Sequence, residues 1–257
     1  MNSLTAVIKL SFTRDMIYRA NFWSSVLSRL GFLLVNLAWF GIMYTSLLHV
    51  KNWGYAESMF FLATFQLIET ITIGFFGNSF ANWYQHINSG SLDVILSKPI
   101  DPQLVLSLHA ISFPQLLTIL APATFILYLA ITFPIFTSLF SIAGYMLGIL
   151  LAVSIFYNLW LIIMTFLFWL VGISYWHQLF RSITSFLQVP PIVYEGFLKF
   201  LFYFIIPVFA AVMLPLAIVW DNSVWALCLL LAMATLTTVL ARAFFHYGLK
   251  AYNSASS

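Results

Sequence analysis

Charged side chains are scarce in this sequence. Asp, Glu, Lys and Arg make up 7% of its 257 residues, against about 25% in ordinary soluble domains. Hydrophobic residues make up 63%, and the mean hydropathy is +1.00. A soluble fold of this size cannot bury so much apolar surface in one core. The long apolar runs, such as residues 147–171, also differ from the alternating pattern of a membrane β-barrel. We therefore predict an all-α, polytopic membrane protein.

The sequence also lacks the motifs of common enzymes and metal-binding proteins. The single cysteine, Cys228, allows neither a disulfide nor a cysteine-based metal site within the chain. No GxxxxGK(S/T) phosphate loop and no HExxH sequence occurs, and the five histidines lack metal-ligand spacing. We therefore expect no catalytic, cofactor-binding or metal site in this chain. The N-terminus also lacks a short apolar core followed by a small-residue cleavage site, so we expect no cleaved signal peptide.

The apolar runs divide the chain into about six spans, since a helix needs roughly 20 residues to cross a bilayer. Clear spans cover residues 22–48, 58–80, 140–170 and 223–245. A further span at 104–133 is interrupted by Pro114 and Pro122. Before the first span, residues 1–21 repeat apolar side chains every four positions, at Leu4, Ile8, Phe12 and Met16. This stripe predicts an interfacial helix that enters the first span, with a soluble N-terminus as the alternative.

The stretch between the fourth and the last span allows two topologies. In one, residues 172–197 are cytoplasmic and residues 198–219 form the fifth span. In the other, residues 168–188 form the fifth span, and residues 192–219 dip into the outer leaflet as a re-entrant hairpin. Both topologies place the turn at Trp220, Asp221 and Asn222 outside the membrane.

The distribution of Lys and Arg sets the orientation. With both termini in the cytoplasm, the basic residues that fall inside are Lys9, Arg14, Arg19, Lys98, Arg242 and Lys250. Only Lys51 clearly falls outside. The net charge of +3 is thus explained by the positive-inside bias of a membrane protein, and we expect no nucleic-acid partner.

Ionisable residues inside the predicted spans are candidates for a translocation path: Glu69, Arg29 and His109. Glu69 lies mid-span, and a charge at that depth is costly unless it faces protein or water. The alternative is that Glu69 only holds helices together, through a hydrogen bond to Arg29 or His109. His109 also shares a helical face with Ser112, a pair that we expect to serve helix–helix hydrogen bonding rather than catalysis.

The longest stretch that cannot lie in lipid is residues 82–103. Gly90 breaks a helix, Ser91 can cap the next one, Asp93 falls near its positive end, and Pro99 stops it. Its apolar face is formed by Leu92, Ile95 and Leu96. The pattern predicts a short amphipathic helix on the cytoplasmic side, whose apolar face docks into a groove on a soluble partner.

Several short motifs match one known family in order along the chain. They are Tyr18-Arg19-Ala20-Asn21-Phe22, Trp53-Gly54-Tyr55 with Glu57, Gly90-x-Leu92-Asp93-x-x-Leu96-x-Lys98-Pro99, and Gly248-Leu249-Lys250-x-Tyr252-x-Ser254-Ala255-Ser256. With these motifs the chain resembles the small permease subunits of type-2 ABC exporters over nearly its whole length. One departure is Asn52-Trp53-Gly54, where the family usually has Gly-Trp-Ser.

The resemblance implies a single transmembrane permease domain, residues 1–257, that pairs as a homo- or heterodimer. It also implies a separate ATPase subunit on the cytoplasmic side, which holds ATP and Mg²⁺. Residues 1–21 match the family's connecting helix, and residues 190–219 match its re-entrant element, which favours the second topology. The coupling helix then lies within residues 82–103, with the ATPase contact at Gly90, Leu92, Asp93, Leu96, Lys98 and Pro99.

We therefore expect the permease half of an ATP-driven exporter in a bacterial plasma (inner) membrane, surrounded by lipid and not itself an enzyme. The 27 Phe, 12 Tyr and 9 Trp residues suit a hydrophobic or amphipathic substrate. The alternative is an integral membrane enzyme or assembly factor that acts on lipid without an ATPase. Such a protein would need polar residues that converge at one depth.

Overall fold

The computed structural model describes residues 3–43, 45, 54–97, 99–170 and 176–252. Throughout these ranges the chain is helical or irregular, without a strand, so the all-α prediction is confirmed. Some residues named above lie outside the described residues: Lys51, Asn52, Trp53, Lys98, residues 254–256 and the side chain of Leu4.

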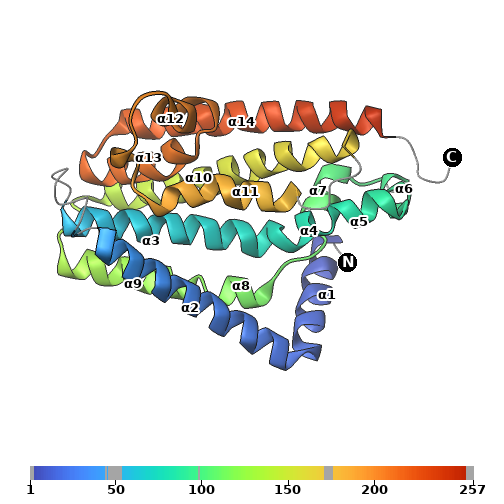
Figure 1. Cartoon of the computed structure of the whole chain (residues 1–257), viewed down its shortest axis with the longest axis horizontal. Coiled ribbons are helices and arrows are strands. Elements are labelled where there is room, and N and C mark those ends of the chain that lie inside the picture. Colours follow the sequence, from blue (N-terminus) through green and yellow to red (C-terminus); the bar gives the residue numbers. More distant parts are fainter. Residues whose placement is uncertain (1–2, 44, 46–53, 98, 171–175, 253–257) are drawn as a thin grey trace.

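Long helices run side by side along one axis (Figure 1). By length and composition, five segments of the described chain are apolar enough to cross a membrane: Arg19–Ile42, Tyr55–Asn88, Phe113–Thr132, Leu139–Phe168 and Val224–Ala251. A bent pair, Gly196–Ile205 with Val208–Trp220, makes a sixth when it is counted as one span. The prediction of about six spans is therefore confirmed.

The core forms around α10 (Leu139–Thr165), α13 (Val208–Trp220) and α14 (Val224–Ala251), which pack on one another. Gly144 of α10 allows the close approach of α13, because a Cβ there would lie 2.7 Å from the Cγ2 of Ile218. The second span is the most enclosed: 72% of its most apolar 18-residue window is buried, against 17% for the first span. The first span therefore has a wide surface free for lipid or a partner.

The second span continues past its predicted end at residue 80. Helix α3 (Tyr55–Thr72) runs through a π-helical turn (Ile73–Gly77) into α4 (Asn78–Ala81), and α5 (Trp83–Asn88) follows. The whole segment rises about 50 Å, which exceeds the ~30 Å hydrocarbon core of a bilayer. One end of this span therefore projects beyond the membrane, and the start of the predicted polar loop is helical.

The third span is broken into α7 (Pro102–Leu108), α8 (Phe113–Leu117) and α9 (Leu120–Thr132). Pro114 and Pro122 each lie in the first turn of a helix, where the missing N–H of proline costs no hydrogen bond. Residues 109–112, between α7 and α8, lie outside these helices. We call these four residues the break.

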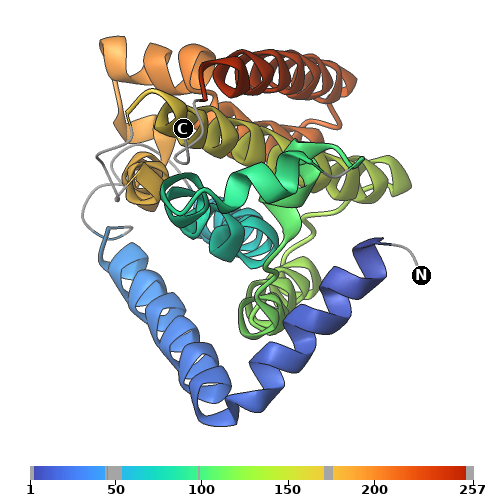
Figure 2. The same ribbon diagram turned by 90° about the vertical axis from the view of Figure 1, so that its right-hand side faces the viewer.

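The N-terminal residues form α1 (Ser3–Ile17), which turns at Tyr18 into α2 (Arg19–Met43). Helix α1 lies across the long axis of the bundle, and Figure 2 shows α1 and α2 meeting in a V to one side of the other helices. The predicted helix is present, but its apolar stripe is not its buried side. Ile8 and Phe12 are 46% and 48% exposed, whereas Ser11 is buried.

Helix α11 (Trp176–Thr184) runs along the bundle axis (Figure 1), and its Phe180 ring stacks on Trp160 of α10 with centroids 4.5 Å apart. Helix α12 (Gly196–Phe200) leads through a π-helical turn (Leu201–Ile205) to a 79° bend before α13. Both α12 and α13 lie beside the half of α14 that begins at Val224 (Figure 1). The bent pair is either a broken fifth span, as in the first predicted topology, or a hairpin before the last span, as in the second.

Candidate functional site

A hollow of about 530 Å³ opens among α2, α3 and α11. Its charged side chains are Arg29 of α2, Glu69 of α3 and Arg181 of α11. Its other lining residues are Ser28, Phe32, Phe65, Gln178, Ser182, Ser185 and Gln188. The hollow thus brings together Glu69 and Arg29, two of the three residues predicted for a translocation path.

The charges lie deep in apolar helices. At 1.5 Å per residue, Glu69 lies about 21 Å along α3 from Tyr55, and Arg29 lies about 15 Å along α2 from Arg19. Arg181 belongs to a polar stripe at helical spacing, formed by Gln178, Arg181 and Ser182 of α11 and by Ser185 of the 3-10 turn that follows it (Ser185–Gln188). The opposite side of α11 carries Phe180, which is buried against α10. The hollow is therefore where these helices place the polar groups that lipid would exclude.

Glu69 interacts electrostatically with Arg181 and Arg29 but forms no direct ion pair with either. Direct ion pairs outside the hollow join Arg14 to Asp15 at 3.2 Å and Arg242 to Asp101 at 3.3 Å. Glu69 and Arg29 are half-buried, and Arg181 is exposed toward the hollow. Two guanidinium groups thus face one carboxyl group, so positive charge is in excess whatever the protonation of Glu69.

A second cavity, of about 20 Å³, lies behind Glu69 between α2, α3 and α8. Its polar lining is formed by Arg29, Gln66, Glu69, Thr70, Gln115 and Thr118. The Nε2 atom of Gln66 is buried and has no hydrogen-bond partner in the protein. A space of this size admits one water molecule. Glu69 is therefore bordered by polar groups on both sides.

His109 lies in the break, away from Glu69 and Arg29. Its Nε2 atom is 3.3 Å from Nε2 of His86 in α5, and its Nδ1 atom is 3.2 Å from the carbonyl oxygen of Leu106. The Nδ1 atom of His86 lies 2.9 Å from Oγ of Ser91, so a hydrogen-bonded chain runs from α6 (Ser91–Leu96) to the break.

The predicted coupling segment lies at one end of the bundle as helix α6 (Figure 1). Gly90 precedes α6 with φ of 70°, a left-handed conformation that favours glycine, and thereby fixes where the helix starts. Asp93 lies in the first turn, as predicted. The predicted Ser91 cap is wrong, because Gly90 is the N-cap and the Ser91 hydroxyl contacts His86 instead.

The apolar face of α6 is covered by its own chain. Leu92 is 0% exposed, and Ile95 and Leu96 pack against the same core. The expectation that Leu92 enters a groove on a partner is therefore wrong, since its surface is already removed from water. Among the described residues from Ser91 to Asp101, the large apolar side chains that remain exposed are Val94, at 60%, and Ile100, at 40%.

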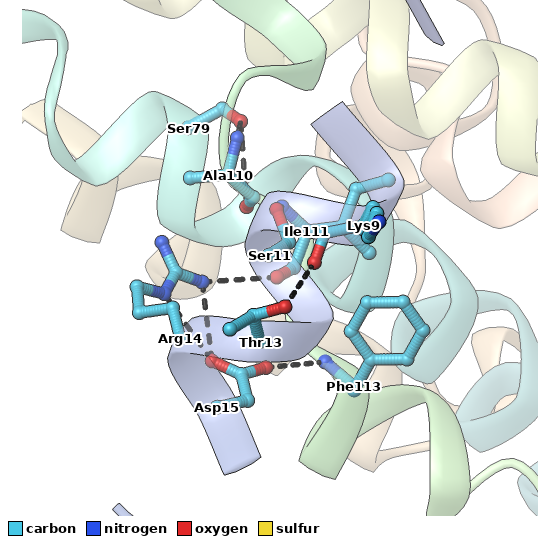
Figure 3. Close-up of polar contacts among 9 residues, drawn as sticks. All are labelled: Lys9, Ser11, Thr13, Arg14, Asp15, Ser79, Ala110, Ile111 and Phe113. Carbon is cyan, nitrogen blue, oxygen red and sulfur yellow. Dashed lines mark hydrogen bonds and ion pairs between the residues drawn. The ribbon is translucent and has the colours of Figure 1, made fainter. Parts of the chain in front are cut away.

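The break leaves backbone groups outside the helical hydrogen-bond pattern, and α1 supplies partners for them (Figure 3). The Ser11 hydroxyl accepts from the N–H of Ile111 at 3.3 Å, and Arg14 donates to the carbonyl oxygen of Ile111 at 3.0 Å. The Oδ2 atom of Asp15 accepts from the N–H of Phe113 at 2.9 Å. These contacts explain why α1 turns its polar side chains inward.

The second span supplies further partners for the break. The Ser79 hydroxyl accepts from the N–H of Ala110 at 3.0 Å (Figure 3), and the carbonyl oxygen of Gly74 accepts from the N–H of Ser112 at 2.9 Å. Irregular backbone within a membrane protein needs such partners, because lipid provides none. We call the meeting point of α1, the second span and the break the joint.

Sequence reasoning missed Arg181 and the partners within the joint. A signal for Arg181 exists in the spacing of Gln178, Arg181, Ser182 and Ser185, which gives one helix a polar side within an aromatic-rich stretch. No local signal connects Ser11 or Asp15 to the break. Across the described ranges, no three His, Cys, Asp or Glu side chains gather so as to hold a metal ion.

Comparison with known families gives a match over most of the chain. The model of a family described as "ABC-2 family transporter protein" matches residues 30–256, a range that includes most of the first span, the other spans and α6. Searches of the curated proteins and of the solved structures found no match.

Proposed function

The chain belongs to the ABC-2 transporter family, and we propose that it is the permease subunit of an exporter driven by a separate ATPase. The observation that carries this proposal is the hollow among α2, α3 and α11, where three ionisable side chains meet inside a multi-pass membrane protein. Intramembrane charges that share one hollow are typical of a substrate path. We propose that a hydrophobic or amphipathic substrate passes through it.

In this proposal, ATP hydrolysis takes place on the partner. The chain has no phosphate-binding loop, so ATP and Mg²⁺ are assigned to the ATPase subunit and no cofactor is assigned to this chain. Helices α1 and α6 and the C-terminal end of α14 lie toward the same end of the bundle (Figure 1). Arg14, Arg19 and Arg242 favour a cytoplasmic position for that end, in a bacterial plasma (inner) membrane.

The coupling contact is assigned to the exposed residues of the α6 region rather than to Leu92. Val94 and Ile100 offer apolar surface at the proposed cytoplasmic end. Displacement of α6 would reach the third span through Ser91, His86 and His109, which connect α6 to the break. The ATPase cycle would thereby shift the permease between inward-open and outward-open states.

A second permease subunit is assigned to the side of the molecule that carries α2. That helix is little covered by its own chain, and it forms one wall of the hollow. A second copy or a related permease against this side would enclose the hollow. The substrate would then pass between two subunits.

The test is co-purification of the ATPase with the full-length chain from its native membrane. We expect a P-loop ATPase among the bound proteins, and we expect Val94→Asp to release it. The matched control is Val224→Asp, because Val224 is 59% exposed at the start of α14, at the opposite end of the bundle. Recovery of no ATPase by the unmodified chain would contradict the proposed function, and full recovery with Val94→Asp would contradict the assigned contact.

A further inference from the structure

The hollow has an excess of positive charge that its own residues do not neutralise. Arg29 and Arg181 face one carboxyl group, that of Glu69, and neither forms a direct ion pair with it. Charges interact more strongly, and cost more when left unbalanced, where water is scarce. A bound anion would restore the balance between charges in the hollow.

The donor groups of the hollow fit oxyanions. A guanidinium presents N–H groups in a planar fork that matches two oxygens of a phosphate or carboxylate. The hydroxyls of Ser28, Ser182 and Ser185 line the same space but donate to backbone carbonyl oxygens nearby, so the donors left for an anion are those of the two arginines. Arg29 comes from α2, whereas Arg181 comes from α11. An anion held between them would therefore contact two separate helices.

The hollow also has an apolar part. Phe32 of α2 lines it and is 46% exposed, and Phe65 of α3 forms part of the same wall. On α2, Leu27 and Val35 add exposed apolar surface, at 67% and 66%. A ligand that lies across this region would place a polar group near the arginines and an apolar part along α2.

We infer that the hollow binds a phosphate- or carboxylate-type anionic group, carried by an amphiphilic substrate. This inference rests on the proposed function, because it names the substrate class of the same path. A phosphate or carboxylate group is present both on lipid headgroups and in free anions in water. Binding measurements distinguish these two kinds of ligand.

The experiment measures binding to the full-length chain, purified in a zwitterionic detergent at fixed concentration. The probe is a fluorescent short-chain phosphatidic acid, and the competitors are unlabelled phosphatidic acid, phosphatidylcholine of equal chain length and inorganic phosphate. We expect phosphatidic acid to compete and phosphatidylcholine to compete poorly. Weak competition by inorganic phosphate supports the lipid headgroup as the source, and equally strong competition supports the anion site but overturns the amphiphile assignment.

Charge variants then test the residues. Arg29→Gln and Arg181→Gln should each weaken probe binding about tenfold or more, since each removes charge-assisted hydrogen bonds. Arg242→Gln is the control, because Arg242 pairs with Asp101 outside the hollow. Glu69→Gln should bind the probe at least as tightly as the unmodified chain, since it removes the opposing carboxyl group. A general loss of folding would weaken all variants, so thermal stability is measured in parallel.

The inference is overturned if folded Arg29→Gln and Arg181→Gln variants bind the probe as the unmodified chain does, or if phosphatidylcholine competes equally. It is also overturned if Glu69→Gln weakens binding as strongly as the arginine variants. Because the assay needs neither ATP nor a partner, its failure leaves the co-purification result unaffected. If co-purification fails, the binding result can still be interpreted.

Discussion

The Asp15 carboxylate accepts a hydrogen bond at 2.9 Å from the backbone N–H of Phe113, which joins the N-terminal helix α1 to the first residue of α8. The contact bridges two segments that lie far apart in the sequence. It satisfies one of the N–H groups at the start of a helix, which has no partner within that helix. The charged acceptor also lies at the positive end of the short helix α8.

Asp15→Ala should therefore destabilise the protein. Loss of the acceptor leaves the partly buried N–H of Phe113 without a partner, at a cost of about 1–3 kcal/mol. Thermal unfolding of the purified chain measures the effect. The control is Asp221→Ala, since Asp221 is exposed in the turn before α14. Equal melting temperatures for the two variants would contradict the role assigned to Asp15.

Gly90→Ala should destabilise the start of α6. Its φ of 70° places an alanine in the left-handed region, at a cost of about 1–2 kcal/mol, although a Cβ there meets no neighbouring atom within 4 Å. Gly31→Ala is the matched control, because Gly31 also has open space around it but lies inside α2. That change should stabilise the helix by about 0.5–1 kcal/mol. We expect Gly90→Ala to lower the melting temperature and Gly31→Ala to raise it. A raised melting temperature for Gly90→Ala would contradict the left-handed conformation of Gly90.

Asn158→Leu should weaken the pairing of α10 with α14. The Nδ2 of Asn158 donates to the Thr238 hydroxyl at 2.8 Å and lies 3.4 Å from that of Thr237. Hydrogen bonds between membrane helices contribute about 0.6–2 kcal/mol. Thr235→Val serves as the control, because Thr235 is exposed and bonds only to Ala232 within its own helix. Thermal unfolding in detergent compares the two variants. If Asn158→Leu unfolds at the same temperature as the unmodified chain, the hydrogen bonds between α10 and α14 do not contribute to stability as proposed.

The sequence predicted spans and deep charges more readily than it predicted contacts. Glu69 and Arg29 stand out because charges are rare within apolar runs, and the structure places both on one hollow. Arg181 did not stand out, because its stretch fitted either a cytoplasmic segment or a span. The choice depends on how α11 packs on α10, through rings such as Phe180 and Trp160. That packing is a tertiary property without a local pattern.

In the α6 region, too, the sequence predicts the helix but not its contacts. The spacing of Leu92, Ile95 and Leu96 predicts an apolar face but does not specify which neighbour covers it. In the structure the neighbour is the same chain, so Leu92 is buried and Val94 is exposed. At the joint, Pro114 signalled an interruption of the third span. The partners Ser11 and Asp15 were not predictable, because they belong to a helix about a hundred residues earlier in the chain.

The most direct test of the proposed path measures access to the hollow during the ATPase cycle. The single native cysteine is replaced by Cys228→Ser, and a reporter thiol is introduced by Ser182→Cys on α11. Asn222→Cys is the control in the exposed turn before α14. A membrane-impermeant thiol reagent is applied from either side of sealed vesicles that contain the chain and its ATPase.

We predict that the Ser182→Cys thiol reacts from the cytoplasmic side without nucleotide. Trapping the ATPase with ATP and vanadate should slow that reaction several-fold and make the thiol reactive from outside. The Asn222→Cys thiol should react from outside in both states. If the rates at Ser182→Cys are the same from each side with and without trapping, the hollow is not part of an alternating path, and the central claim is contradicted.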